Sequence, residues 1–478
     1  MSYPRVIQGG MGVAVSNWRL AQAVASRGQM GVVSGTGIDT VMSRRLQLGD
    51  PGGILQRAFD AFPVKEMARR VWDRYFIPEG KADDAAFRSR PVINIQTGKA
   101  AIELTIVSNF VEVWLAKQGH RGPIGINLLE KIQLPHLPSL FGAMLAGVDY
   151  VLMGAGIPRQ IPAVLDSLSQ LDETEYRVDV AGAQSGEAFY SRLKPRELAD
   201  WPYEKLVRPK FLAIVSSSVL AQTLIRKCTP PVDGFVVEGP LAGGHNAPPR
   251  GPLVLDENKE PVYGPRDVPD LEAIRELGAP FWMAGAYGEP HMLAKALEAG
   301  AQGVQVGTAF AFCNESGIDP DIKRRVIRKV LKGEIQVRTD ALASPTGFPF
   351  KVVQMEGTLS TEEVFAERQR ICDLGYLRTP YRKADGTVGY RCASEPIDDY
   401  VAKGGQLEDT EGRRCICNAL LATIGLAQRR KDGTVEPPIL TAGNDLVNIG
   451  RFIKPGGEEY TVDDVLAHIL AGAPKEHA

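Results

Sequence analysis

His245 is the side chain whose neighbours best prepare it to move a proton. It follows Gly243 and Gly244, which remove steric bulk and would let the imidazole lie against a ligand. Histidine also titrates near neutral pH, which suits general acid–base catalysis. We therefore predict that His245 is catalytic, with a structural histidine as the alternative. The remaining histidines are expected to be structural or solvated: His120, His136, His291, His468 and His477.

Two glycine-containing segments in the middle of the chain predict a phosphate site. Gly285-Ala286 and Gly307-Thr308 each follow a short apolar run. Small residues there would leave backbone N–H groups free, and a helix that begins behind them adds its positive end. We expect Ala286 to keep a phosphate contact only if its φ is negative. The alternative is that both segments merely form tight turns.

Two further loops carry residues that could hold a flat ligand. Gly9-Gly10-Met11-Gly12 follows the first apolar run, and its glycines would let the backbone approach a planar group closely. Asn127 lies at the end of a later run, with an amide that both donates and accepts. We predict that Gly10, Met11, Gly12 and Asn127 bind one ligand together with the phosphate loops.

The elements that must position these loops are short apolar runs alternating with helical stretches. Nearly uniform apolar character is typical of parallel strands buried on both faces. Eight such runs predict an α/β fold, a (β/α)8 TIM barrel, in which the loops at the carboxyl ends of the strands form the active site. The predicted strands span residues 5–8, 30–34, 123–128, 150–153, 211–215, 234–237, 281–284 and 303–306.

Two insertions and a tail exceed a minimal barrel. We assign residues 1–335 to the barrel, with inserted helices near 52–95 and an insertion near 154–208 that includes an additional strand at 175–180. The alternation stops near residue 335. Residues 336–478 are predicted to form a C-terminal elaboration that packs over or beside the barrel mouth, as a lid.

Composition and charge exclude several classes of protein. A hydrophobic content of 44% and a charged content of 23% favour a globular protein over a disordered one. A net charge of -2 predicts no nucleic-acid or anionic-membrane surface. No apolar run reaches the roughly 18 residues of a membrane span, and the first residues do not resemble a signal peptide. We expect a cytoplasmic protein with a small-molecule substrate; a homodimer is compatible with the sequence.

The order of these motifs resembles that of the nitronate monooxygenase family, also called 2-nitropropane dioxygenase-like, which includes FMN-dependent enoyl-ACP reductase II. The motifs that carry the resemblance are Gln8-Gly9-Gly10-Met11, Gly125-Ile126-Asn127-Leu128, Ala242-Gly243-Gly244-His245, Ala284-Gly285-Ala286 and Gln305-Val306-Gly307-Thr308. The chain departs from the family at Ala286, where a second glycine is usual, and after His245, where Asn246-Ala247-Pro248-Pro249 is stiffer than usual.

The resemblance implies an FMN flavoprotein with His245 near the reactive edge of the flavin. Its implied FMN contacts are Gly10, Met11, Gly12, Asn127, Gly243, Gly244, Gly285, Ala286, Gln305, Gly307 and Thr308. The first activity implied is oxidation of a nitronate, or a similar small carbanion, with O2. The alternative within the family is an NAD(P)H-dependent reductase of an enoyl thioester or quinone. Two alternatives lie outside this family. One is a flavin-free phosphate-binding barrel, such as an isomerase or lyase, and the other is a partner-binding subunit.

Four of the six cysteines fall in the C-terminal region, at Cys372, Cys392, Cys415 and Cys417. Ordinary buried cysteine is the default interpretation, so we expect no metal. Four thiolates could also hold Zn2+ or an iron–sulfur cluster. Their spacing matches no standard ligand pattern.

Overall fold

The computed structural model describes residues 3–473. Eight parallel strands form one sheet in the order β1-β10-β9-β8-β7-β4-β3-β2, and a parallel bridge between Ile7 and Met30 brings its two edges together. The predicted (β/α)8 barrel is confirmed. Its strands are β1 (Val6–Gln8), β2 (Gly31–Ser34), β3 (Ile124–Leu129), β4 (Tyr150–Gly154), β7 (Lys210–Val215), β8 (Gly234–Glu238), β9 (Phe281–Ala284) and β10 (Gly303–Val306).

The strands form because apolar side chains are covered on both faces of the sheet. All four residues of β9 are buried, as are all four of β2. One compact apolar cluster, which includes Ile7, Leu212 and Trp282, belongs to the barrel strands and is separate from the much larger cluster shared with the helices. Because the barrel is closed and packed, ligands can enter only at the ends of its strands.

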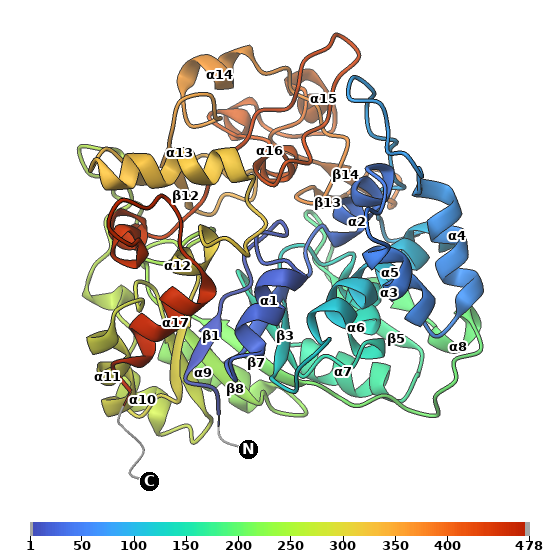
Figure 1. Cartoon of the computed structure of the whole chain (residues 1–478). Helices are drawn as coiled ribbons and strands as arrows, with labels where there is room; N and C mark the ends of the chain where they lie inside the picture. Colours follow the sequence, from blue (N-terminus) through green and yellow to red (C-terminus); the bar gives the residue numbers. More distant parts are fainter. Residues whose placement is uncertain (1–2, 474–478) are drawn as a thin grey trace.

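Helices surround the barrel and begin at ordinary start signals (Figure 1). Asn17 caps α1 by accepting from the Leu20 N–H, and Ser217 caps α9 in the same way. Outside the two insertions, the α-helices before residue 335 include α1 (Trp18–Ala25), α2 (Ile38–Gln47), α6 (His136–Leu145), α7 (Ile161–Ser169), α9 (Ser218–Lys227), α10 (Leu271–Arg275), α11 (Pro290–Glu298), α12 (Thr308–Ala311) and α13 (Pro320–Leu331).

The first insertion is helical for only part of its length. Helices α3 (Ile54–Ala61) and α4 (Lys65–Tyr75) pack on the long helix α5 (Lys99–Ala116), but residues 76–98 contain no helix. The predicted helical insertion at 52–95 is therefore wrong in its second half. Pro78 and Gly80 explain this, because both residues disfavour helix.

The second insertion contains the additional strand that the sequence predicts. β5 (Thr174–Val178) pairs antiparallel with β6 (Phe189–Leu193), outside the barrel sheet. Tyr176 and Val178 are buried while their neighbours are exposed, which is the alternation of a half-buried strand. The short helix α8 (Pro195–Leu198) follows.

After residue 335 the chain forms small antiparallel pairs and irregular segments. β11 (Gln336–Asp340) pairs with β12 (Phe350–Gln354), and β13 (Thr379–Arg382) with β14 (Val388–Arg391). In Figure 1 helices α14, α15 and α16 lie at one end of the molecule, away from α17, which packs on the barrel helices α1 and α11. The bounds are α14 (Glu362–Glu367), α15 (Ile397–Ala402), α16 (Ile416–Thr423) and α17 (Val462–Leu470). A domain boundary at residue 335 stays a prediction.

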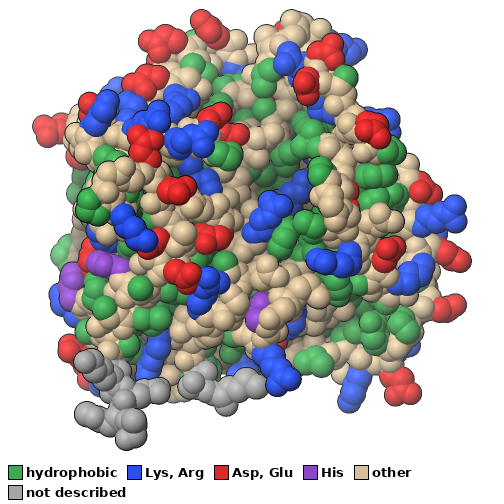
Figure 2. All heavy atoms as spheres, viewed as in Figure 1, with side chains coloured by type: hydrophobic (Ala, Val, Ile, Leu, Met, Phe, Trp, Pro, Cys, Tyr) green, Lys and Arg blue, Asp and Glu red, His purple; other side chains and the backbone are tan. Residues whose placement is uncertain are grey.

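The surface turned toward the viewer in Figure 2 carries acidic and basic side chains interspersed. This distribution agrees with the near balance of 55 basic and 57 acidic residues. Among residues 3–473, no helix combines the length and apolar character that crossing a membrane requires.

Candidate active site

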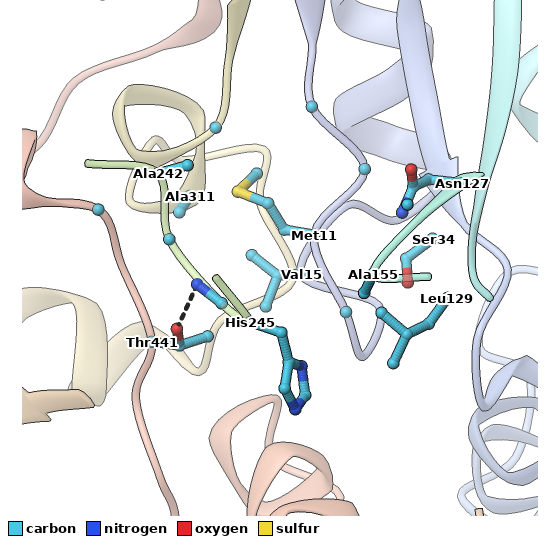
Figure 3. Close-up of a pocket in the computed structure, with 18 of the residues that line it drawn as sticks. Met11, Val15, Ser34, Asn127, Leu129, Ala155, Ala242, His245, Ala311 and Thr441 are labelled. Carbon is cyan, nitrogen blue, oxygen red and sulfur yellow. Dashed lines mark hydrogen bonds between the residues drawn. The ribbon is translucent and has the colours of Figure 1, made fainter. Parts of the chain in front are cut away.

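One cavity at the carboxyl ends of the barrel strands is lined by every residue that the sequence predicted for the site. Loops after β1, β3, β8, β9 and β10 meet there, together with segments of the C-terminal region (Figure 3). The predicted residues that line it are Gly10, Met11, Gly12, Asn127, Gly243, Gly244, His245, Gly285, Ala286, Gln305, Gly307 and Thr308.

The loop after β1 is held by two buried polar side chains. The Gln8 amide donates to the Gly9 carbonyl and the Ser16 hydroxyl, and its Oε1 accepts from the Val32 N–H. The Ser16 hydroxyl in turn accepts from the Met11 N–H at 2.8 Å. These bonds fix the glycine turn before any ligand arrives.

Gly10 is required because its backbone lies against Asn127. A Cβ at position 10 would stand 2.3 Å from the Cβ of Asn127 and 3.0 Å from a methyl of Val32. No side chain fits that space. The contact joins the two predicted ligand-binding loops, and both residues line the cavity.

The two predicted phosphate loops lie together and present free donors. In the described chain, no protein acceptor takes the N–H groups of Gly285, Ala286, Gly307 or Thr308. All four residues line the cavity, and α12 begins at Thr308. Converging free N–H groups are what an anion such as phosphate requires. We call these four residues the N–H cup.

Ala286 does not have the negative φ that the sequence analysis required. Its φ is +60°, after Gly285 at +100°. A left-handed alanine costs roughly 1–2 kcal/mol, so the surrounding structure holds the turn in this form. The expectation that Ala286 keeps a phosphate contact only at negative φ is therefore not fulfilled. The free N–H survives because consecutive residues of positive φ can turn their amides toward one concave spot.

A C-terminal segment, Thr441–Asp445, crosses both glycine motifs. The Gly244 N–H donates to the Thr441 hydroxyl at 2.9 Å (dashed in Figure 3), and the Gly443 N–H donates to the Thr308 hydroxyl at 2.8 Å. A Cβ on Gly243 would lie 2.7 Å from the Gly443 nitrogen. This segment was not predicted from the sequence. The only local signal for it was Gly443 close to the polar residues Thr441 and Asn444.

His245 is partly buried and bonded to the C-terminal region. Its Nε2 shares a 2.7 Å hydrogen bond with the Ser344 hydroxyl, and its ring lies 4.8 Å from that of Phe350. Burial, with a smaller effect of the nearby Lys131 charge, lowers the pKa of His245 to about 4. The imidazole is thus neutral at pH 7, able to donate through one nitrogen and accept through the other.

Two more polar side chains face the cavity, and the sequence analysis missed the first. Glu238 ends β8, and burial raises the pKa of its carboxyl to about 7. Gln305 lines the cavity beside Gly9 with a buried Oε1 that has no partner among the described residues. A buried acceptor without a donor fits a ligand that brings one. Glu238 could have been predicted from its position at a strand end.

The outer wall of the cavity comes from the C-terminal region. Tyr376 is fixed there by hydrogen bonds to Asp39 and to the Thr40 hydroxyl. The C-terminal side chains other than Thr441–Asp445 that line the cavity are Phe350, Tyr376, Leu377, Ile416, Cys417 and Leu420, which we call the roof. The roof makes the space beside His245 apolar.

Charge in the cavity is unusual, because no lysine or arginine lines it. Within the described chain its only acidic lining residues are Glu238 and Asp445. Asp445 is neutralised by Arg451 at 2.6 Å. An anion can therefore be held at the N–H cup through backbone donors. Lys131 acts on His245 from outside the lining, and no lysine or arginine of the described residues lines the space itself.

The residues present fit FMN on two observations. The N–H cup suits its phosphate, and the orphaned Gln305 Oε1 suits a ring N–H.

Comparison with known proteins finds a family match for the region that contains the N–H cup. Residues 205–342 match the family model described as nitronate monooxygenase. A stretch of 146 residues, 30% of this chain, is 30% identical to 36% of (3aS,4S,5R,7aS)-5-hydroxy-7a-methyl-1-oxo-octahydro-1H-indene-4-carboxyl-CoA dehydrogenase of Mycobacterium tuberculosis. A stretch of 96 residues, 20% of this chain, is 33% identical to 26% of a probable nitronate monooxygenase of Bacillus subtilis.

Solved structures with a similar chain trace include FabK from Thermotoga maritima, with 14% identity, a TM-score of 0.49 and coverage of 98% of this chain and 93% of that one. Nitroalkane oxidase from Streptomyces ansochromogenes has 15% identity, a TM-score of 0.44 and coverage of 98% and 96%.

Fold and site together define a closed α/β barrel with family motifs gathered in one cavity. Residues 205–342 match the nitronate monooxygenase family model, which confirms the resemblance that the motifs indicated. The chain spans about a third or less of the length of the two curated relatives.

Proposed function

We propose that this protein is an FMN-dependent oxidoreductase that reduces an α,β-unsaturated acyl thioester, with NAD(P)H as the hydride donor. The observation that carries the choice of substrate is the charge of the cavity. Among the described residues, the lining beside His245 offers apolar roof side chains and no lysine or arginine, and Lys131 lies outside it. A nitronate is an anion and would contact no cationic side chain of the lining, whereas an enoyl thioester is neutral at its reacting atoms.

Each group of residues has a role in this proposal. A bound FMN would supply the hydride chemistry. The N–H cup would hold its phosphate, and Gly10, Met11, Gly12 and Asn127 would lie against its ring, with Gln305 Oε1 accepting from a ring N–H. The Leu377 and Ile416 side chains would exclude water and hold the acyl chain.

His245 and Glu238 would have different roles, one as a hydrogen-bond donor and the other as a proton donor. With its pKa lowered to about 4, His245 stays neutral and would donate a hydrogen bond to the thioester carbonyl, strengthening as negative charge develops there. With its pKa raised to about 7, Glu238 is partly protonated at neutral pH and would give a proton to the reduced product.

Oxidation of a nitronate, the first activity implied by the sequence, remains the second candidate. One curated relative is named a probable nitronate monooxygenase, and a neutral His245 could accept a proton from a nitroalkane.

Anaerobic half-reactions separate the two candidates. Flavin absorbance is followed while the purified protein is mixed with NADPH, NADH or propyl-2-nitronate. We expect bleaching by a reduced nicotinamide, followed by recovery on addition of 2-butenoyl-CoA. Bleaching by the nitronate but by neither nicotinamide would overturn the proposal, as would a bleached flavin that the thioester fails to reoxidise.

A further inference from the structure

The four C-terminal cysteines, separated by up to 45 positions in sequence, line one small cavity. Cys372 lies between α14 and β13, Cys392 follows β14, and Cys415 and Cys417 lie at the start of α16. All four line the same cavity, together with Ser394 and Asn418. The Cys372 and Cys392 thiols are within hydrogen-bonding reach of each other. None of the four forms a disulfide.

Two arginines beside these thiols have no carboxylate partner among the described residues. Arg370 donates only to the carbonyls of Ala393 and Thr410, at 3.1 and 2.8 Å. Arg378 donates only to those of Gly375 and Ile93. Arg370 lies near Cys392, and Arg378 near Cys372. Half-buried cations that face thiols without a carboxylate fit a site whose thiols carry negative charge.

An amide donor beside Cys415 points to the same conclusion. Cys415 is the N-cap residue of α16, and its sulfur accepts from the Asn418 amide at 3.6 Å. The apolar cluster nearest the four cysteines is small. It contains nine buried residues, of which Ile132 comes from the barrel loops, while the barrel cluster is many times larger. A metal centre would add cross-links between segments that share so few apolar contacts.

We propose that Cys372, Cys392, Cys415 and Cys417 hold an iron–sulfur cluster of the four-iron type. Each thiol gives up its proton on ligation, and the two free arginines offset the charge. A single Zn2+ is the less favoured occupant. Within residues 3–473 no three histidine, cysteine or acidic side chains lie close enough to share one metal ion. Cys372 and Cys392 lie close together, but no third ligand among the described residues joins them around one ion. A cluster offers several iron atoms, so it can join this pair to Cys415 and Cys417.

The position of this site connects it to the active site. Cys417 and Leu377 line both the cysteine cavity and the large cavity below the roof. A cluster here would clamp the segments that carry Tyr376, Leu377 and Cys417 over the barrel mouth, and it would place a one-electron centre beside the flavin pocket. The proposal stands on the cysteines and does not depend on the substrate proposed above.

Metal and sulfide analysis of the full-length protein, purified without oxygen, tests the proposal. We expect about four iron and about four acid-labile sulfide per chain, and an electron paramagnetic resonance signal after reduction by dithionite. Cys392→Ser and Cys415→Ser should each lose more than half of the iron and the signal. Cys228→Ser and Cys313→Ser, which remove buried barrel thiols, should keep both.

Three results would overturn it. One is no iron or sulfide even after anaerobic reconstitution with ferrous iron and sulfide. Another is one zinc per chain with no iron, found by native mass spectrometry of the intact protein. The third is iron that is unchanged by the cysteine substitutions, which would be adventitious. Because the wild-type protein alone gives the first two, poor folding of a variant leaves the proposal testable.

Discussion

The barrel loops and the roof contribute to the same cavity in different ways. The loops after β1, β9 and β10 act through their backbones, by free N–H groups and by the absence of side chains at glycines such as Gly10. The roof acts through apolar side chains brought from residues 350–420. In the function proposed above, the backbone groups of the barrel loops would bind the cofactor, and the apolar side chains of the roof would select the substrate.

The largest expected effect is on the barrel side, at Gly10→Val. The added side chain would overlap Asn127, since even its Cβ would lie 2.3 Å away. We expect FMN affinity to fall about 10²-fold, because overpacking typically costs about 1–3 kcal/mol. Fluorescence titration of the flavin-free protein measures it. Gly98→Ala is the matched control, since a Cβ there meets nothing within 4 Å; equal losses in both variants would break the comparison.

His245→Ala should lower turnover by about 10²-fold while bound flavin is retained, the usual scale for a proton-transfer group. The histidine lies between the two regions, and its bond to Ser344 is with the C-terminal side. Steady-state rates and the flavin absorbance of the same sample give both numbers. The exposed His291→Ala serves as the control. Normal turnover with normal flavin content would remove His245 from the mechanism.

Leu377→Ala tests the roof. It should raise KM for a long-chain acyl thioester about 10-fold with flavin binding unchanged, because apolar surface beside the substrate is lost. Leu359→Ala is the matched control: both leucines belong to the same buried cluster, but only Leu377 lines the cavity. Both variants should lose stability, by about 2–5 kcal/mol. A KM that rises equally in both would mean that the roof acts only through folding.

Glu238→Gln tests the raised pKa of the Glu238 carboxyl through the pH dependence of stability. Burial raises its folded pKa to about 7, so ionisation in the cavity is unfavourable. The wild-type protein should lose stability as pH rises from the ordinary value of a carboxyl, about 4.3, through about 7, and Glu238→Gln should abolish that part of the loss. Unfolding midpoints at pH 5 and 8 measure it, with the exposed Glu257→Gln as the control. Parallel pH dependence in wild type and Glu238→Gln would contradict the shift.

The smallest effect is expected at Ala286→Gly. Relief of the left-handed φ should stabilise the fold by about 1 kcal/mol without loss of FMN, because the N–H remains. Lys259→Gly, at φ +60° in an exposed loop, gives the same relief away from the cavity. Chemical unfolding and flavin retention are measured together. Weaker flavin binding in Ala286→Gly alone would show that the methyl group itself contributes.

The same contrast explains what the sequence could and could not predict. All eight barrel strands were predictable because each is a short apolar run covered on both faces, as in Phe281–Ala284. The N–H cup was predictable because small residues follow the strand in two consecutive strand–helix units, Gly285-Ala286 and Gly307-Thr308. The roof was not, because Leu377 and Ile416 look like any buried residue until the fold brings them over the barrel. Thr441–Asp445 lies more than 130 positions from the Thr308 hydroxyl that it contacts, and no local pattern encodes that pairing.

The central claim, that backbone donors of the barrel hold a flavin phosphate, is tested most directly by a crystal structure of the FMN-loaded protein. The account predicts the phosphate within hydrogen-bonding distance of the N–H groups of Gly285, Ala286, Gly307 and Thr308, with the ring against Gly10 and Asn127. A phosphate bound elsewhere, or a protein that binds no FMN at all, would contradict it.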